Sequence, residues 1–212
     1  MTNKNLERLI DNLGEDLKPQ KPMKHPLLRM LPLLVLTPIL TFAIAHFIGM
    51  RADWSEMMMY DTRFQLEIGL ALAIALSSGA VLGWVNLPDM RQQPWVLAIP
   101  LVFMLVFFGY IGYMLYQEGL TGMKFQTRYF SDAFMLSLIP TLLLLFILKK
   151  GCPSCHKKTA LFATMAIAAF SWIGLRLTCP IDYAGHNFIV QFAPFFVLGL
   201  LAALFSAKLF KW

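Results

Sequence analysis

Three cysteines carry the most reactive side chains of this sequence, and two of them form a CxxCH motif. Cys152, Cys155 and His156 stand in Cys-Pro-Ser-Cys-His, the spacing at which c-type haem is attached. The same residues supply two or three of the four ligands that a structural zinc ion needs. The lysines around the motif favour thiolates, as in a redox pair. A tight Gly-Cys-Pro turn with idle, reduced thiols is the remaining alternative.

The third cysteine, Cys179, opens a different polar gap, which it shares with Asp182 and His186. A thiol, a carboxylate and an imidazole could together hold a soft or borderline metal ion, as a sensor. An odd cysteine can also form an intermolecular bond or remain a reactive thiol. A small buried residue at a helix end is an equally good interpretation. We find no Ser/His/Asp set, phosphate-binding loop or HExxH motif, so we predict that the protein is not an enzyme.

These residues must be positioned by helices that cross a membrane. Hydrophobic residues make up 58% of the chain and charged residues 14%, which is outside the range of soluble proteins. Apolar stretches, each near the roughly 20 residues that span a bilayer, occupy 30–49, 64–85, 95–116, 130–148, 159–177 and 188–207. Lipid offers no partner to bare peptide groups, so these stretches must be helical. The predicted fold is all-α, a polytopic membrane bundle of six transmembrane helices.

The distribution of Lys and Arg predicts the orientation of this bundle. Thirteen of the 18 lie in the two tails and in the second and fourth gaps, and five lie in the other three gaps. By the positive-inside rule the thirteen face the cytoplasm. We therefore predict a multi-pass inner-membrane protein with both termini cytoplasmic. The net charge of +6 is then a topology signal and not a sign of direct nucleic-acid binding.

This orientation discriminates between the alternatives for the CxxCH motif. The motif lies on the cytoplasmic side, whereas c-type haem is attached outside the inner membrane. A zinc site there would need His25 as well, or a second copy of the chain in a homodimer. Because the cytoplasm keeps thiols reduced, we favour the turn with idle thiols and predict no cofactor. The bilayer separates Cys179, on the oxidising side, from the other two cysteines.

Four ionisable side chains fall within or at the ends of the predicted spans: His46, Glu67, Asp132 and Arg176. Charge inside a bilayer is costly and by default suggests function. All four lie near the outer boundary, where side chains can reach the interface. Glu67 follows Arg63 by four residues, so these two can share one helix face. None lies at mid-bilayer beside a broken helix, as an ion-coupled transporter would prefer.

The N-terminal tail, residues 1–29, is the one sizeable segment outside the predicted transmembrane domain, residues 30–212. Its apolar residues recur at helical spacing and form one stripe, made of Leu6, Leu9, Ile10, Leu13 and Leu17. The opposite face is acidic except for Arg8, which disfavours anionic lipid and suits a groove on a partner protein. From this pattern alone, a short amphipathic helix on the membrane and one bound to a protein are equally good interpretations.

Short motifs along the chain are ordered as in a known family. Leu9-Ile-Asp-Asn-Leu-Gly-Glu-Asp-Leu-Lys-Pro19 is similar to an opening "LI..L..DL.P". Ser137-Leu-Ile-Pro140 with Leu148-Lys-Lys-Gly151 is similar to "SLP…LRRG". Leu177-Thr-Cys-Pro180 is similar to "LHCP", and Lys208-Leu-Phe-Lys-Trp212 to "RLLRW". Over nearly its full length the chain thus resembles the NrsF family, bacterial six-span anti-sigma factors described as negative regulators of sigma factor F.

The resemblance implies a function in signal transduction. Members hold an extracytoplasmic-function sigma factor at the membrane through their cytoplasmic surface, and envelope, metal or redox stress releases it. Cysteines on the outer side are implicated in sensing. One corresponds to Cys179, with Asp182 in the acidic position after it, whereas Tyr129-Phe130-Ser131 stands where the other is expected. The usual aromatic pair after "CP" is also altered, to Gln191-Phe192.

We therefore predict a membrane-anchored anti-sigma factor whose tail stripe binds the sigma factor. The alternative is a membrane thiol-disulfide oxidoreductase that passes electrons to a quinone. Such an enzyme needs cysteines that can exchange with one another. Here two cysteines lie on the inner side of the membrane and one on the outer side, so they are poorly placed for exchange. A small transporter is a third candidate, which the lack of polar residues at mid-membrane disfavours.

Replacing both Cys152 and Cys155 by Ser should leave membrane insertion and sigma-factor capture intact, because a Gly-Cys-Pro turn does not depend on thiols. The measurement is the metal content of the purified protein together with its insertion. Stoichiometric zinc that disappears in the double variant would contradict the prediction of a turn with idle thiols.

Overall fold

The structure, a computed structural model, describes residues 25–85, 94–119, 127–149 and 156–192, with a few single residues beyond. All regular structure in these ranges is helical. The long helices are α2 (Pro26–Ile48), α4 (Thr62–Val85), α5 (Ala98–Glu118), α6 (Thr127–Lys149) and α7 (His156–Thr178). The short ones are α3 (Trp54–Tyr60), the 3-10 turn η2 (Pro94–Leu97), α8 (Ala184–His186) and the π-helical turn η3 (Asn187–Phe192). The tail stripe, Cys152, Cys155 and most of the predicted sixth span lie outside the described residues.

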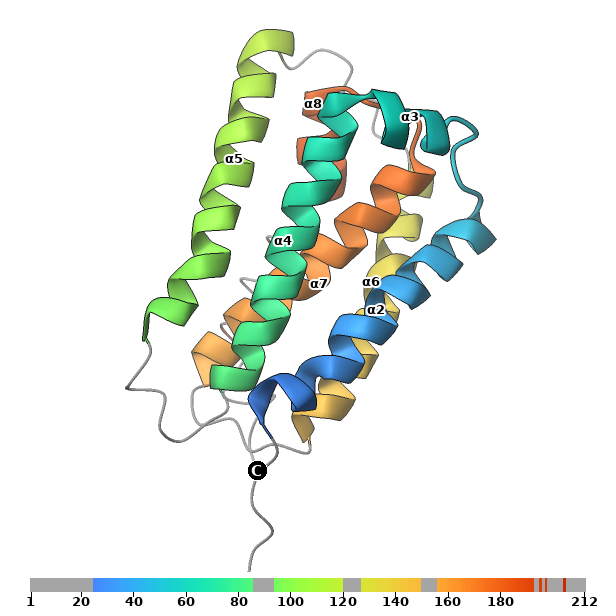
Figure 1. The fold of residues 1–212 in the computed structure, drawn as a ribbon. Helices are drawn as coiled ribbons and strands as arrows, with labels where there is room; N and C mark the ends of the chain where they lie inside the picture. Colours follow the sequence, from blue (N-terminus) through green and yellow to red (C-terminus); the bar gives the residue numbers. More distant parts are fainter. Residues whose placement is uncertain are drawn as a thin grey trace, which may run out of the picture.

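The five long helices run alternately up and down (Figure 1). This brings the α2–α3 turn, the end of α5 and residues 179–186 to one end of the bundle, the top in Figure 1, which we call the loop end. α7 lies in the centre of the bundle. In its most apolar stretch 72% of the residues are buried, whereas the corresponding shares are 17% for the η2–α5 segment and 22% for α2. The most extensive interface is between α4 and α7. The site described below lies where this central pair reaches the loop end.

Four of the described helical segments are long and apolar enough to cross a membrane: Pro26–Ile48, Thr62–Val85, Pro94–Glu118 and Lys157–Thr178. The all-helical prediction is therefore confirmed for the described part of the chain. α6 covers the predicted fourth span, although its apolar stretch, Ser131–Leu144, is shorter. α2 begins at Pro26, four residues before the predicted span, because proline is well suited to the first position of a helix, where its missing N–H is not needed.

Glycines let α2 approach α4 closely at the opposite end of the bundle. A Cβ on Gly83 would lie 2.6 Å from the Pro26 carbonyl oxygen, and one on Gly79 would lie 2.6 Å from Leu34 Cδ2. Their GxxxG spacing puts both on one face of α4, as in closely packed membrane helices. The contact between α2 and α4 at this end therefore depends on small residues, whereas the loop end combines an apolar cluster of Ala45, Phe64, Ile68 and Leu177 with charged side chains.

Candidate functional site

Seven charged side chains form a continuous series of contacts at the loop end, in which acidic and basic groups alternate. Each is within ion-pair distance of the next. We call this series the ion-pair chain, and in order of contact it consists of Asp53, Arg51, Asp182, Arg176, Glu67, Arg63 and Glu118. Four carboxylates enclose three guanidinium groups, so every arginine has an acid on both sides.

The centre of the ion-pair chain is a buried pair between α7 and α4. Arg176 Nε lies 2.7 Å from Glu67 Oε2, and both side chains are completely buried. Arg63, one turn before Glu67 on α4, also donates to that carboxylate at 3.2 Å. Arg63 pairs in turn with Glu118 at the end of α5. Glu118 accepts a hydrogen bond from the Ala184 backbone N–H at 2.8 Å, so the carboxylate connects α5 to α8.

The other half of the ion-pair chain joins the α2–α3 turn to the loop after α7. Arg51 donates to both oxygens of Asp53, at 2.7 and 3.0 Å, and to both oxygens of Asp182, each at 2.9 Å. Arg176 donates to Asp182 at 2.8 Å. The guanidinium groups of Arg51 and Arg176 lie 5.7 and 5.3 Å from the centre of the Phe64 ring, within the range of a cation–π contact. Five separate segments of the chain thus meet here.

Asp182 is held in its charged form by two arginines. Burial alone would raise the pKa of its carboxyl, but the hydrogen bonds from Arg51 and the charge of Arg176 outweigh burial and hold the pKa below its usual range. A lowered pKa contributes stability above the ordinary carboxyl pKa, and this stability is lost as the pH falls through the lowered value. The Asp182 contacts are therefore fully formed at neutral pH.

Cys179 lies beneath this charged layer with its thiol inaccessible. The residue is 0% exposed, and its Sγ lies 3.6 Å from Nε2 of His186, which is also fully buried. Burial raises the pKa of the Cys179 thiol, although Arg176 and Gln191 act in the opposite direction. Arg51 donates a long hydrogen bond, 3.4 Å, to the Cys179 carbonyl oxygen. A raised pKa keeps the thiol protonated at neutral pH, and its full burial keeps it from solvent.

The structure brings two of the three predicted sensor residues together. Cys179 and His186 are neighbours, whereas the Asp182 carboxylate faces Arg51 and Arg176. In the described ranges, no three His, Cys, Asp or Glu side chains are arranged to hold a metal ion. His156 is the first residue of α7, but the cysteines of its motif are outside those ranges.

Arg63 and Glu67 share one helix face as predicted, and the structure shows that they also pair. The explanation of the buried charges, in contrast, was wrong. Glu67 and Arg176 do not reach towards the interface, since neither is exposed and each contacts the other. Once buried, each charge needs its opposite beside it, because an unpaired buried charge costs several kcal/mol, on the order of 3–5. His46 is exposed, and Asp132 is buried.

Three members of the ion-pair chain, Arg51, Asp53 and Glu118, were not identified from the sequence. Arg51 and Asp53 stand in the first predicted gap and Glu118 in the third. An alternating topology places these gaps at the same end of the bundle, so opposite charges in alternate gaps are the signal that could have revealed the cluster. Which charges pair depends on distances that only the folded bundle supplies.

The match to a protein family covers the whole described part of the chain. Residues 13–212 match the family NrsF, described as "Negative regulator of sigma F". The chain belongs to this family. No curated protein and no solved structure gives a significant match. Membership confirms the resemblance inferred from the short motifs, and the family description implies a non-enzymatic negative regulator of a sigma factor.

In this NrsF-family protein, removing the central charge of the ion-pair chain should destabilise the bundle far more than removing a terminal one. Glu67→Gln leaves two arginines without a buried carboxylate, and breaking such a pair costs about 3–5 kcal/mol. Asp53→Asn is the matched control, because Asp53 is half exposed and such pairs contribute about 0–1 kcal/mol. Thermal unfolding of the detergent-solubilised protein measures both, and equal loss in the two variants would contradict a buried centre.

Proposed function

We propose that this protein is a membrane-anchored anti-sigma factor that holds an extracytoplasmic-function sigma factor at the inner membrane of a bacterium and releases it under envelope, metal or redox stress. The observation that carries the proposal is the family match over residues 13–212. In this proposal the chain crosses the membrane six times, both termini are cytoplasmic, and the loop end faces outwards.

The charges at the two ends of the bundle support this orientation. Arg51, Arg63 and Arg176, at the loop end, are each neutralised by carboxylates of the ion-pair chain. At the opposite end, Lys157 and Lys158 are exposed at the start of α7. By the positive-inside rule, exposed lysines at one end of the bundle support a cytoplasmic location for that end, which leaves the loop end outside.

The ion-pair chain offers a route by which an outer event could alter the bundle. Cys179 is fully buried, so a bulky adduct on its sulfur, whether an oxidation product or a bound metal, needs space that the folded loop lacks. Asp182 is in the same loop and joins Arg51 to Arg176. Moving the loop would therefore separate contacts between the α2–α3 turn, α7 and α4. A regulator requires two such states that differ in affinity for its partner.

The sigma-factor contact in this proposal is the tail stripe of Leu6, Leu9, Ile10, Leu13 and Leu17. The double variant Leu9→Asp with Leu13→Asp should abolish capture of the cognate sigma factor, because each change puts a charge into a desolvated interface, at a cost of several kcal/mol. Asn12→Asp, on the opposite face, adds one negative charge outside the stripe and should change capture little.

Pull-down from detergent-solubilised membranes at equal expression measures this capture. Undiminished capture by the double variant would place the sigma-factor contact elsewhere and leave the tail as a helix on the membrane. Loss of capture in Asn12→Asp as well would mean that negative charge, and not the apolar stripe, decides binding.

Breaking the Asp182 contacts should expose Cys179 to the outside. In intact spheroplasts, a membrane-impermeant maleimide should label wild-type Cys179 slowly and the Asp182→Asn variant quickly, because the neutral side chain no longer holds the loop between two arginines. Asp53→Asn leaves those contacts in place and serves as the control, with the sites of labelling identified by mass spectrometry.

Two outcomes would contradict this part of the proposal. Labelling of Cys179 in Asp182→Asn that requires permeabilised membranes would invert the orientation. Equal labelling rates for wild type and Asp182→Asn, with full labelling after denaturation, would show that the ion pairs do not shield the thiol.

A further inference from the structure

A groove of about 320 Å³ lies between α6 and α7. The three hydroxyl groups in its lining are already hydrogen-bonded within their own helices. Ser137 donates to the Phe134 carbonyl at 2.9 Å, Thr141 to the Ser137 carbonyl at 2.7 Å, and Thr164 to the Ala160 carbonyl at 2.9 Å. The other lining residues are Phe134, Leu138, Ile167, Ala168 and Phe195. The groove therefore presents an apolar surface, which suits an apolar occupant.

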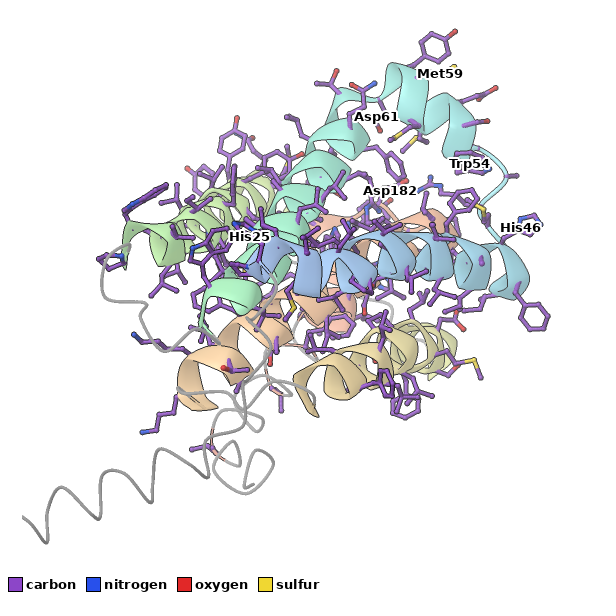
Figure 2. All side chains as sticks on the ribbon, turned by 60° about the horizontal axis from the view of Figure 1, so that its bottom comes forward. His25, His46, Trp54, Met59, Asp61 and Asp182 are labelled. Atoms are coloured by element: carbon purple, nitrogen blue, oxygen red, sulfur yellow. The ribbon has the colours of Figure 1, made fainter. Side chains whose placement is uncertain are left out.

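The chain reaches this groove from the loop end. His25 and His46, at the two ends of α2, mark the two ends of the bundle in Figure 2, and the loop end is the one with His46. From there the chain passes through α8 and η3 to Phe195. Phe195 packs in one apolar cluster with Leu136 of α6 and Leu175 of α7. Its ring thus already joins the chain to both walls of the groove.

The rest of the groove lies further from the loop end than these contacts. α6 runs away from the loop end, so residues 137–141 lie beyond Leu136. α7 runs towards the loop end, so residues 164–168 lie below Leu175 in the view of Figure 1. A chain that continues from Phe195 along the groove therefore runs towards the opposite end of the bundle.

Burial indicates which face of the segment after η3 points into the bundle. Phe195, Val197 and Leu204 are helical. Val197 and Leu204 are 54% and 70% exposed, whereas Phe195 is 4% exposed. The two exposed residues are about two helical turns apart, so they share one face, and Phe195 lies on the opposite face. In a continuous helix the face of Phe195 also contains Gly199, Ala202 and Ser206.

Length and composition suit a helix that crosses a membrane. Residues 193–207 contain no charged side chain, and together with η3 they provide the roughly 20 residues that span a bilayer. Gly199, Ala202 and Ser206 are small, which allows membrane helices to approach one another closely. Lys208 and Lys211 follow. A helix along the groove brings them to the end of the bundle where α7 begins with exposed lysines.

We propose that residues 193–207 form a membrane-crossing helix that fills the groove between α6 and α7 with the face of Phe195, Gly199, Ala202 and Ser206. Because Phe195 is already part of the lining, the residues after it are held beside the groove at a high effective concentration. This favours the chain's own last segment over a lipid chain or a second copy. The docking rests on the six-span arrangement proposed above, but it makes no use of sigma-factor binding.

Paired cysteines test this contact in the full-length protein in membranes, with Cys152 and Cys155 replaced by Ser. Ala202 follows Phe195 by about two turns, which brings it to the part of the groove lined by Thr164. Oxidation with copper phenanthroline should therefore form a disulfide within one chain in the double variant Thr164→Cys with Ala202→Cys. The control, Thr164→Cys with Leu204→Cys, should react about tenfold more slowly, because a disulfide requires Cα atoms within about 7 Å and Leu204 points away from the bundle.

Mass spectrometry identifies the bond, and gel electrophoresis separates single chains from linked pairs of chains. Thr141→Cys with Ala202→Cys repeats the test on the α6 wall, so a single variant that fails to insert does not decide the outcome. Bonds that join two chains would assign the groove to a second copy and overturn the proposal. Equal rates with Ala202→Cys and Leu204→Cys, or no bond in inserted protein, would overturn it as well. Sigma-factor capture by the same variants distinguishes the two proposals, since capture without an Ala202→Cys bond would contradict only the docked helix.

Discussion

The structure depends on one physical constraint: Arg176 and Glu67 are both fully buried, and a buried charge is stable only beside its opposite. Their contact joins α7 to α4, the pair with the most extensive packing in the described bundle. A single pair would leave guanidinium hydrogens and carboxylate oxygens without partners. Asp182 accepts a hydrogen bond from Arg176, and Arg63 donates one to Glu67. These two residues in turn pair with Arg51 and Glu118. The ion-pair chain is therefore the consequence of placing two charges in the centre of the loop end.

This arrangement gives the two ends of the bundle different properties. At one end, α2 contacts α4 through glycines whose close approach allows no larger side chain without rearrangement. At the loop end, contacts between charged side chains add to a small apolar cluster around Phe64. The charged contacts are directional and break when one group moves. A regulator of the NrsF family needs a part that can change on one side of the membrane and a part that keeps its packing. The ion-pair chain, which contacts the Cys179 carbonyl through Arg51, suits the first requirement.

The local expectations succeeded where a short sequence distance determined the geometry. Arg63 and Glu67 are four residues apart on one helix and do pair, and the helical character of the apolar stretches follows from the lack of hydrogen-bond partners in lipid. The sequence did not decide whether Cys179 is a reactive sensor or a small buried residue. Its burial and its contact with His186 depend on how residues 179–186 fold after the end of α7. A periodic pattern in the sequence does not contain this information.

The sequence by itself determined the helical class, the alternating course of the described helices and the family, because apolar length, the distribution of Lys and Arg and the order of short motifs are properties of the chain alone. Tertiary structure decided which charges meet. Arg51 and Asp182 are 131 positions apart, and Glu118 meets Ala184 across 66, so their pairing depends on how five segments converge at one end. Likewise, Phe42 of α2 and Trp54 of α3 pack edge-on across the turn at Gly49, a contact that the sequence spacing alone does not predict.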